Sequence, residues 1–161
     1  MSAFVEIVAE SVPIPCHASK CSKDGCSVTL ESAPHPRVLI DLDCEELGLL
    51  KGTRCDYVFV GADSATVWVA PIELKSGTFK GNHARAQLQA GADIAAQWLP
   101  PGKNGFRLAP VLARGPQRVH RRDYMALRAV KIRLRAQRRQ AIMIKCGQAL
   151  RTALGKFPKS P

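Results

Sequence analysis

The chain has 161 residues, of which 46% are hydrophobic and 23% are charged, enough for a folded core and for one domain over 1–161. This composition excludes a wholly disordered chain, and no run approaches the roughly 18 consecutive apolar residues of a membrane-spanning helix. Residues 1–10 carry acids and no base, unlike a secretory signal, so we expect a cytoplasmic protein that contacts no membrane.

The net charge of +11 hides a steep asymmetry along the chain. Residues 1–100 hold 8 basic and 12 acidic side chains, a net of −4, whereas residues 101–161 hold 16 basic and 1 acidic, a net of +15. Arginine supplies most of the basic charge and suits phosphate groups. The asymmetry predicts an acidic site in the first part and a nucleic-acid-binding surface in the second, with DNA favoured. A solvated basic face, or a dock for an acidic protein, is the alternative.

The first segment, 1–36, is expected to be rich in loops. Residues 3–9 fit either a short strand or a short helix. Residues 11–36 are rich in Ser, Pro, Cys and Lys, which is typical of loops.

The cysteines admit two interpretations. Cys16, Cys21 and Cys26 lie at regular spacing and offer zinc ligands, but the paired CxxC spacing of structural zinc sites is absent. Without a secretory signal, we favour free thiols over zinc or a disulfide framework. Cys55 and Cys146 fall in apolar runs and are expected to be small core residues.

The middle of the chain predicts a strand followed by a hairpin. Residues 37–44 are strand-like, and 45–50 fit a short helical turn. The β-branched and aromatic runs 55–60 and 66–74 flank a turn at 61–65, which is typical of a β-hairpin.

The rest of the chain alternates helix and strand. Apolar residues follow helical spacing over 82–99, with Asn82 as the expected N-cap. The later elements are expected to be strands at 106–113, 130–135 and 141–146, a turn at 137–140, and a short helix at 147–155. This order predicts an α/β or α+β fold with a central mixed sheet flanked by helices.

The Arg-rich half, 101–161, also predicts a cationic surface. Val130, Ile132 and Leu134 alternate with basic residues, so one strand face should be buried and the other positively charged. The predicted nucleic-acid-binding residues are Arg121, Arg122, Lys131, Arg133, Arg135, Arg138 and Arg139. Charges that protect an exposed sheet edge are the alternative.

Three ionisable residues, Asp56, Glu73 and Lys75, lie within apolar strands, where a charge is costly unless it is paired or bound to metal. With the turn at 61–65, paired residue numbers sum to about 129, so Asp56 should face Glu73. Lys75, two residues further on, should share their face. Two adjacent carboxylates favour Mg²⁺ or Mn²⁺, and a neighbouring lysine can act on water or phosphate. An ordinary cross-strand salt bridge is the alternative.

This arrangement resembles the PD-(D/E)XK nuclease superfamily, which has the restriction-endonuclease-like fold. Its members place an Asp at the start of one strand, a Glu-x-Lys on the next antiparallel strand and a Gln on the following helix. In this chain RCDYVFVG supplies Asp56, APIELKSG supplies Glu73 and Lys75, and HARAQLQ supplies Gln87. The likeness covers residues 37–99, the expected catalytic core.

The resemblance implies a Mg²⁺- or Mn²⁺-dependent nuclease that hydrolyses phosphodiester bonds in DNA, and less readily in RNA. It implies that Asp56, Glu73 and the backbone carbonyl of Leu74 bind the metal. Lys75 would be the catalytic lysine and Gln87 a supporting residue of the active site.

Many members add an acid from their first helix, and here several acids compete. We rank Glu46 and Glu45 first because they precede LGLL in a short helical turn. The other candidates are Asp41, Asp43, Glu31 and Glu10. Since no recognition helix is evident, we expect weak intrinsic sequence specificity. Stronger specificity would require a second copy in a homodimer or a protein partner. The alternative is a catalytically inactive nuclease-like module that binds nucleic acid or protein.

Overall fold

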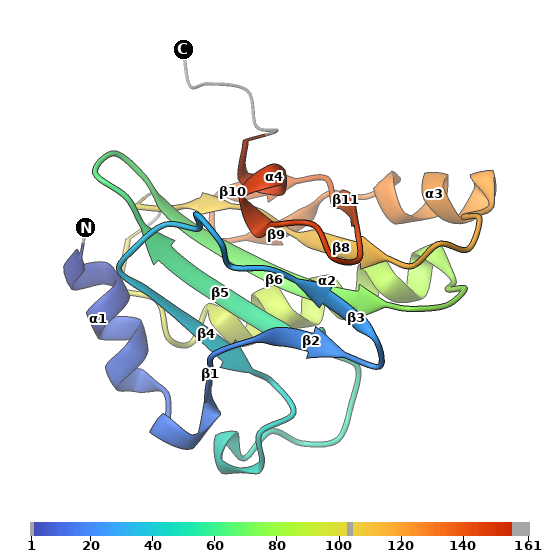
Figure 1. The fold of residues 1–161 in the computed structure, drawn as a ribbon. Coiled ribbons are helices and arrows are strands. Elements are labelled where there is room, and N and C mark those ends of the chain that lie inside the picture. The colour runs from blue at the N-terminus through green and yellow to red at the C-terminus, as the bar shows by residue number, and fades with distance from the viewer. Residues whose placement is uncertain (1, 103–104, 156–161) are drawn as a thin grey trace.

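The computed structural model describes residues 2–102 and 105–155, and its elements surround a central sheet (Figure 1). The elements in chain order are α1 (Ser2–Ser11), the 3₁₀ helix η1 (Ile14–Cys16), β1 (His17–Ala18), β2 (Cys21–Lys23), β3 (Cys26–Val28), β4 (Arg37–Asp41), the 3₁₀ helix η2 (Glu45–Leu47), β5 (Tyr57–Ala62), β6 (Val67–Lys75), α2 (Gly81–Ala95), β7 (Arg107–Leu108), β8 (Val111–Arg114), α3 (Arg121–Arg128), β9 (Ile132–Leu134), β10 (Gln137–Arg139), β11 (Ile142–Lys145) and α4 (Leu150–Leu154). None of the helices within the described ranges is long and apolar enough to cross a membrane.

The central sheet has seven strands in the order β1-β4-β5-β6-β8-β11, with β7 also paired to β6. The strands β4, β5 and β6 form an antiparallel meander, whereas β6, β8 and β11 run parallel to one another. The chain crosses from β6 to β8 through α2. The architecture is therefore α/β, with the mixed sheet and flanking helices that the sequence predicts.

The β5–β6 hairpin has the predicted register. Tyr57 pairs with Ile72 and Ala62 with Val67, so every pair sums to 129. The turn between the strands is stabilised by its own hydrogen bonds. The Asp63 carboxylate accepts the N–H groups of the two residues before β6, at 2.9 and 2.8 Å. Such a local turn sets the register, and the register decides which side chains share a face.

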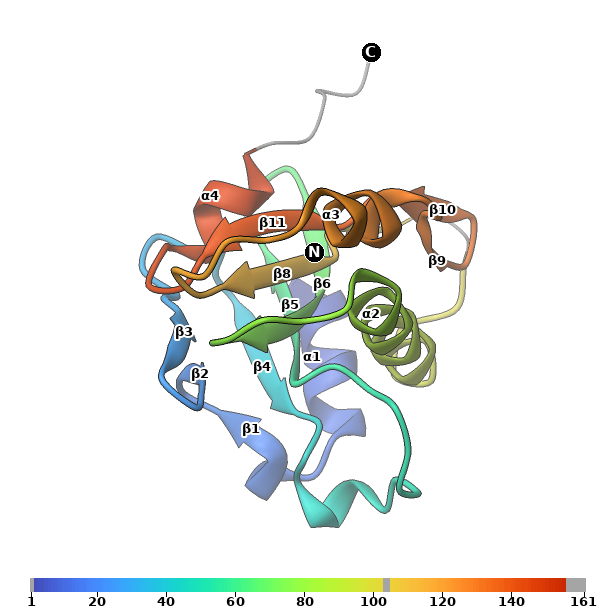
Figure 2. The same cartoon turned by 90° about the vertical axis from the view of Figure 1, so that its right-hand side faces the viewer.

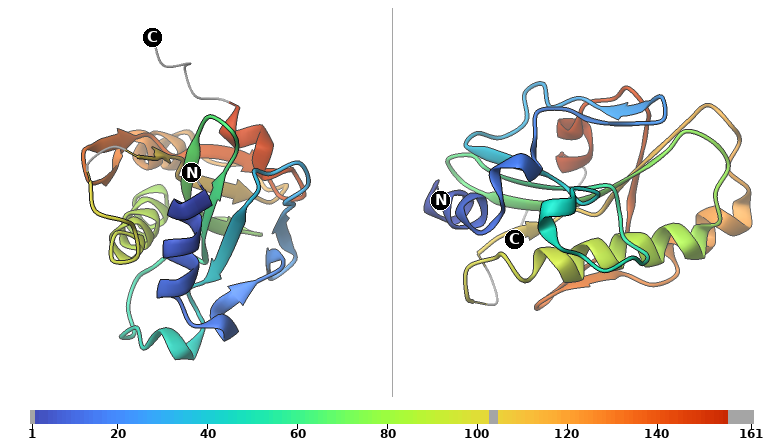
Figure 3. Two further views of the ribbon diagram at one scale, coloured as in Figure 1. Left: turned by 90° about the vertical axis from the view of Figure 1, so that its left-hand side faces the viewer. Right: turned by 90° about the horizontal axis from the view of Figure 1, so that it is seen from below.

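Alternation along the strands divides the core into two layers. Val67 and Val69 of β6 face the cluster that includes α1 and α2, and Trp68 and Ala70 face the cluster that includes α4 and the β2–β3 hairpin. Figure 2 shows α1 and α2 on one side of the sheet and β2, β3 and α4 on the other. The left view of Figure 3 shows α1 lying across the strands.

Helix α2 begins differently from the prediction. Lys80, not Asn82, is the N-cap residue, and its side chain makes no capping hydrogen bond. The N–H of Gly81 is instead donated to the Asp123 carboxylate of α3, at 3.1 Å. A Cβ atom at Gly81 would lie 1.9 Å from the Asp123 carbonyl oxygen, so only glycine permits this approach.

The predicted loop-rich segment 11–36 also contains short strands that the sequence did not indicate. Residues 3–9 belong to helix α1, and two hydrogen-bonded strands, β2 and β3, follow it. Asp24 and Gly25 connect these strands with φ of 50° and 81°. Positive φ at both turn residues is typical of a two-residue hairpin loop, for which Asp-Gly is a preferred sequence.

The predicted strand pattern of the basic half also needs correction. The expected strand at 106–113 is divided into β7 and β8, and the expected strand at 130–135 shortens to β9. Val130 is 57% exposed and lies outside the core. The turn falls at Arg135, whose φ is 54°, and the expected turn at 137–140 is largely strand β10, paired with β9.

The cysteines differ most from expectation. Disulfides join Cys16 to Cys44 and Cys26 to Cys146, so neither free thiols nor the zinc arrangement holds for these residues. Cys55 is buried in the core as predicted, and Cys21 is buried too; burial raises the pKa of the Cys21 thiol to about 12. Disulfides are typical of oxidising compartments, whereas the sequence led us to expect free thiols in the cytoplasm.

Candidate functional site

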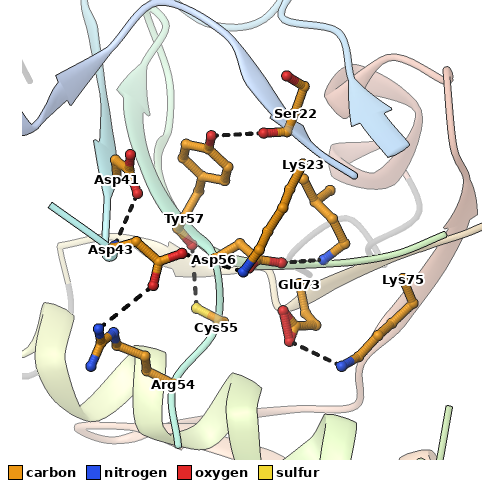
Figure 4. Close-up of polar contacts among 11 residues, drawn as sticks. Ser22, Lys23, Asp41, Asp43, Arg54, Cys55, Asp56, Tyr57, Glu73 and Lys75 are labelled. Carbon is orange, nitrogen blue, oxygen red and sulfur yellow. Dashed lines mark hydrogen bonds and ion pairs between the residues drawn. The ribbon is translucent and has the colours of Figure 1, made fainter. Parts of the chain in front are cut away.

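A cleft of about 630 Å³ opens where β5 begins and β6 ends. The four residues predicted to carry the chemistry, Asp56, Glu73, Lys75 and Gln87, all line this cleft. The regular ladder ends at the pair Tyr57 and Ile72. Just before it, the Asp56 N–H donates to the Ile72 carbonyl at 3.0 Å, and the carboxyl groups of Asp56 and Glu73 are hydrogen-bonded to each other. Figure 4 shows these two carboxylates and Lys75 close together at the ends of their strands.

The Asp56 carboxylate is held from two directions. Its Oδ2 accepts the N–H of Leu74 at 2.8 Å, and its Oδ1 lies 2.8 Å from the Nζ of Lys23. Burial opposes ionisation of Asp56, but its hydrogen bonds with Glu73, Lys23 and Leu74 prevail and lower its pKa. Asp56 is therefore the ionised member of the carboxylate pair.

Glu73 behaves in the opposite way. Its side chain is 2% exposed, and its Oε2 lies 3.6 Å from the Nζ of Lys75 but makes no hydrogen bond. Burial, followed by the adjacent Asp56 carboxylate, raises the pKa of Glu73 to about 9. At neutral pH the two carboxyl groups together therefore hold one proton, as expected for acids that share a buried site.

Gln87 reaches the cleft because α2 packs closely on the hairpin. A Cβ atom at Gly91 would lie 2.1 Å from the Sγ of Cys55, so the small residue permits this contact. Gln87 is one helical turn earlier, and its Oε1 is buried without a hydrogen-bond partner. A buried amide oxygen without a hydrogen-bond partner lowers the stability of the fold, and such oxygens are found at sites that bind a ligand.

Three charged residues complete the site: Asp43, which the sequence ranked low among the candidate acids, and Lys23 and Arg54, which it did not place there. The Nζ of Lys23 bridges Asp56 and the Asp43 carboxylate, which lies 3.2 Å away, and Arg54 lies 3.6 Å from Asp43 (Figure 4). Hydrogen bonding to Asp56 raises the pKa of Lys23 above its ordinary value. The Asp24-Gly25 turn was the one sequence signal that could have revealed the hairpin that carries Lys23.

Glu46, our leading candidate for the additional acid, lies elsewhere. Its carboxylate is 3.1 Å from the Sγ of Cys44. Within residues 2–102 and 105–155, Cys16, Cys44 and Glu46 form the one group of three potential ligands, but its two sulfur atoms are joined in a disulfide. Asp43, which we ranked lower, is the candidate that lines the cleft. Glu46 lies within η2, whereas Asp43 comes two residues after the end of β4, the neighbour of β5.

The cleft residues fit a hard divalent cation. Asp56 and Glu73 offer carboxylate oxygens, and Glu73 Oε2 and Gln87 Oε1 are buried without hydrogen-bond partners. The N–H and C=O of a strand residue point to the same side, so the Leu74 carbonyl lies on the side of Asp56, which its N–H contacts. Oxygen donors of this kind suit Mg²⁺ or Mn²⁺.

The predicted nucleic-acid-binding residues lie on α3 and on or beside the β9–β10 hairpin, where Arg133 is paired with Arg138. Arg121 and Arg122 are exposed at the start of α3, Lys131 and Arg133 lie by a hollow beside α2, and Arg138 is exposed on β10. Arg139, on the same strand, lines a different hollow beside α3.

Arg135 has another role altogether. Its guanidinium group donates to the carbonyl oxygens of Leu99 at 3.0 Å and of Gly102 at 2.9 Å, beyond the end of α2. Arg135 thus ties the β9–β10 turn to the chain that leaves α2, and its contact with nucleic acid stays a prediction. The strand pattern misled us because the backbone at Arg135 turns back instead of extending.

No protein-family model, no curated protein and no solved structure matches this chain. The geometry of the cleft is therefore the basis for the function proposed below.

Proposed function

We propose that this protein is a metal-dependent nuclease that hydrolyses phosphodiester bonds, of DNA in preference to RNA, on a restriction-endonuclease-like fold. The observation that carries the proposal is the contact between the carboxyl groups of Asp56, just before β5, and Glu73, near the end of β6, beside Lys75 in an open cleft. The order of a strand with Asp56, an antiparallel strand with Glu73 and Lys75, and a helix with Gln87 supports it further.

Asp56, Glu73 and the Leu74 carbonyl would hold a Mg²⁺ or Mn²⁺ ion. When bound, such an ion supplies a more acidic water and offsets the charge of the phosphate. Ionised Asp56 supplies most of the negative charge that attracts the cation. A bound cation would favour the Glu73 carboxylate, since a nearby positive charge lowers the pKa of a carboxyl group.

The remaining groups orient the reactants. The Leu74 N–H fixes the Asp56 carboxylate at 2.8 Å, so that its position does not depend on the ligand. The Lys75 ammonium group, 3.6 Å from Glu73 Oε2, offers a positive charge to a phosphate oxygen at the mouth of the cleft. Gln87 would offer its buried amide oxygen to a bound water or to the metal. Together these residues favour water attack on a phosphodiester held against Lys75.

The exposed arginines and lysines outside the cleft supply affinity for the DNA backbone. Phosphate contacts bind nucleic acid without reading its sequence, so weak sequence preference follows. The exposed residues proposed for this role are Arg121, Arg122, Lys131, Arg133 and Arg138. Added specificity from a second copy or a protein partner stays a prediction.

A second candidate function is a nuclease-like module that binds nucleic acid without cleaving it. The observation in its favour is Lys23, whose ammonium group already balances Asp56 at 2.8 Å and Asp43 at 3.2 Å. A cation must compete with this ion pair. If it cannot, the cleft holds no metal.

The test is plasmid nicking by the purified protein, with its disulfides intact, in Mg²⁺ or Mn²⁺ against EDTA. We expect metal-dependent nicking that Glu73→Gln or Lys75→Ala reduces at least about a thousandfold while DNA affinity changes little. Glu31→Gln and Lys20→Ala, exposed and outside the cleft, are the matched controls. Parent-like nicking by Glu73→Gln contradicts the assigned site, and DNA binding without nicking in any metal favours the second candidate.

A further inference from the structure

A groove of about 710 Å³ lies between α3 and β11, and we name it the α3–β11 groove. Its basic residues are Arg114, Arg128, Arg139 and Lys145. None of the described residues that line it is acidic, and within 2–102 and 105–155 no acid forms an ion pair with these four. The groove is therefore positively charged along its length and suits an anionic polymer.

A row of basic residues connects the groove to the catalytic cleft. Lys75 pairs with Arg114, and Arg114 pairs with Lys145, at the carboxyl ends of β6, β8 and β11. Paired residues on adjacent strands share a face, and two strand spacings make the row about 10 Å long. Arg114 also lines a small hollow with Gly77 and Thr78, which both line the cleft. In Figure 2, α3 lies in front of β8 and β11, over this end of the sheet.

The floor of the groove is apolar. Ile142 and Met143 are half-buried there, and Tyr124, 38% exposed, lines the α3 side. The Arg128 guanidinium carbon lies 5.5 Å from the centre of the Tyr124 ring. A duplex offers mainly phosphates to a protein surface and gives this floor nothing to contact. A single strand exposes the faces of its bases, which stack on aromatic and apolar side chains.

We propose that the α3–β11 groove binds a single-stranded segment of nucleic acid and leads it across Arg114 to the cleft. This inference rests on the proposed nuclease function and narrows its substrate to nucleic acid with a single-stranded arm or end. The charged row contacts the phosphates, and the apolar floor with Tyr124 contacts the bases.

The test is fluorescence anisotropy of a labelled single-stranded oligonucleotide, and of the same sequence as a blunt duplex, with full-length oxidised protein in EDTA. The parent should bind the single strand at least about tenfold more tightly than the duplex, because stacking adds to the phosphate contacts. Arg114→Ala with Lys145→Ala should weaken single-strand binding at least about tenfold. It should also flatten the salt dependence of log affinity by about 1.4, or 0.7 per lost contact.

Matched variants distinguish the effect of charge in the groove from the effect of the protein's overall positive charge. Lys20→Ala with Lys51→Ala removes the same charge from exposed positions outside the groove and should leave the slope unchanged. Tyr124→Ala should lose about fivefold or more in single-strand affinity, whereas Tyr124→Phe, which keeps the ring, should not. If the Arg114 variant fails to fold, Lys145→Glu, at an exposed position, serves instead. It should likewise weaken single-strand binding and flatten its salt dependence.

Equal affinity for single strand and duplex overturns the inference. So does a slope of log affinity against log salt concentration that changes no more in the groove variant than in the control. The outcomes also separate the two proposals. Single-strand binding in the groove without cleavage in metal keeps this inference and rejects the nuclease. Metal-dependent cleavage of blunt duplex without single-strand binding does the reverse.

Discussion

The cleft and the α3–β11 groove differ in how their charged side chains are arranged. In the cleft, the buried carboxyl groups of Asp56 and Glu73 contact lysine side chains, and the pKa of Glu73 rises to about 9 while that of Asp56 falls. In the groove, basic side chains lie beside one another without acidic partners among the described residues. Contacts between buried charges are strong and specific, whereas exposed charges act through their sum. Single substitutions should therefore have large effects in the cleft and small, additive effects in the groove.

The largest expected effect separates the turnover rate from affinity. Asp56→Asn should lower kcat of the proposed nuclease at least about a thousandfold, or about 4 kcal/mol in the barrier, because it removes the ionised carboxylate of the cleft. Lys145→Ala should raise KM and change kcat less than about threefold. Steady-state kinetics on one labelled DNA substrate provide both values. A comparable loss of kcat in both variants would break the distinction.

The second expected effect is the dependence of stability on pH. Because the folded state raises the pKa of Glu73 from 4.5 to about 9, folded protein binds more protons than unfolded protein between these values. This contribution to stability should therefore be fully present below pH 4.5 and fall as pH rises towards 9, by at most about 1.4 kcal/mol per pH unit. Denaturant unfolding from pH 5.5 to 8.5 in EDTA measures it. The decline should shrink in Glu73→Gln and persist in the exposed control Glu31→Gln; a parent-like decline in Glu73→Gln would assign it to other groups.

The third prediction tests whether Arg135 stabilises the fold, unlike the exposed basic residues proposed to bind nucleic acid. Arg135→Ala should destabilise the protein by about 2 kcal/mol, since its hydrogen bonds to Leu99 and Gly102 are lost and leave carbonyl groups without that partner. Arg133→Ala, at an exposed position on β9, should change stability by less than about 0.5 kcal/mol. Urea denaturation compares them directly. Equal stability of the two variants would return Arg135 to the set of binding residues.

The smallest expected effect concerns competition within the cleft. Lys23→Met should tighten Mn²⁺ binding about tenfold, or about 1.4 kcal/mol, because the cation no longer has to displace the ammonium group from Asp56. Lys20→Met, at an exposed position in the same segment, is the control. Isothermal titration with Mn²⁺ gives both affinities. Weaker binding in Lys23→Met would instead make Lys23 a support for the bound state.

The cleft could be predicted in large part because its central residues are local in sequence. The hairpin turn at Asp63 sets a register that follows from strand periodicity alone, and that register brings Asp56 and Glu73 to the same end of the hairpin. Helical spacing likewise predicted α2 and placed Gln87 on it. The contribution of Lys23 could not be predicted, because it depends on how the N-terminal hairpin folds back over the end of β5.

The sequence by itself determined the α/β alternation, the hairpin register, the group of Asp56, Glu73 and Lys75, and the concentration of basic charge in the second half. Each of these follows from residue spacing within one or two neighbouring elements. The tertiary structure alone decided the Cys26–Cys146 disulfide, the choice of Asp43 over Glu46 for the cleft, and the structural role of Arg135. Those outcomes depend on which distant segments pack against each other, and packing is set by the whole core, not by the pattern of any one segment.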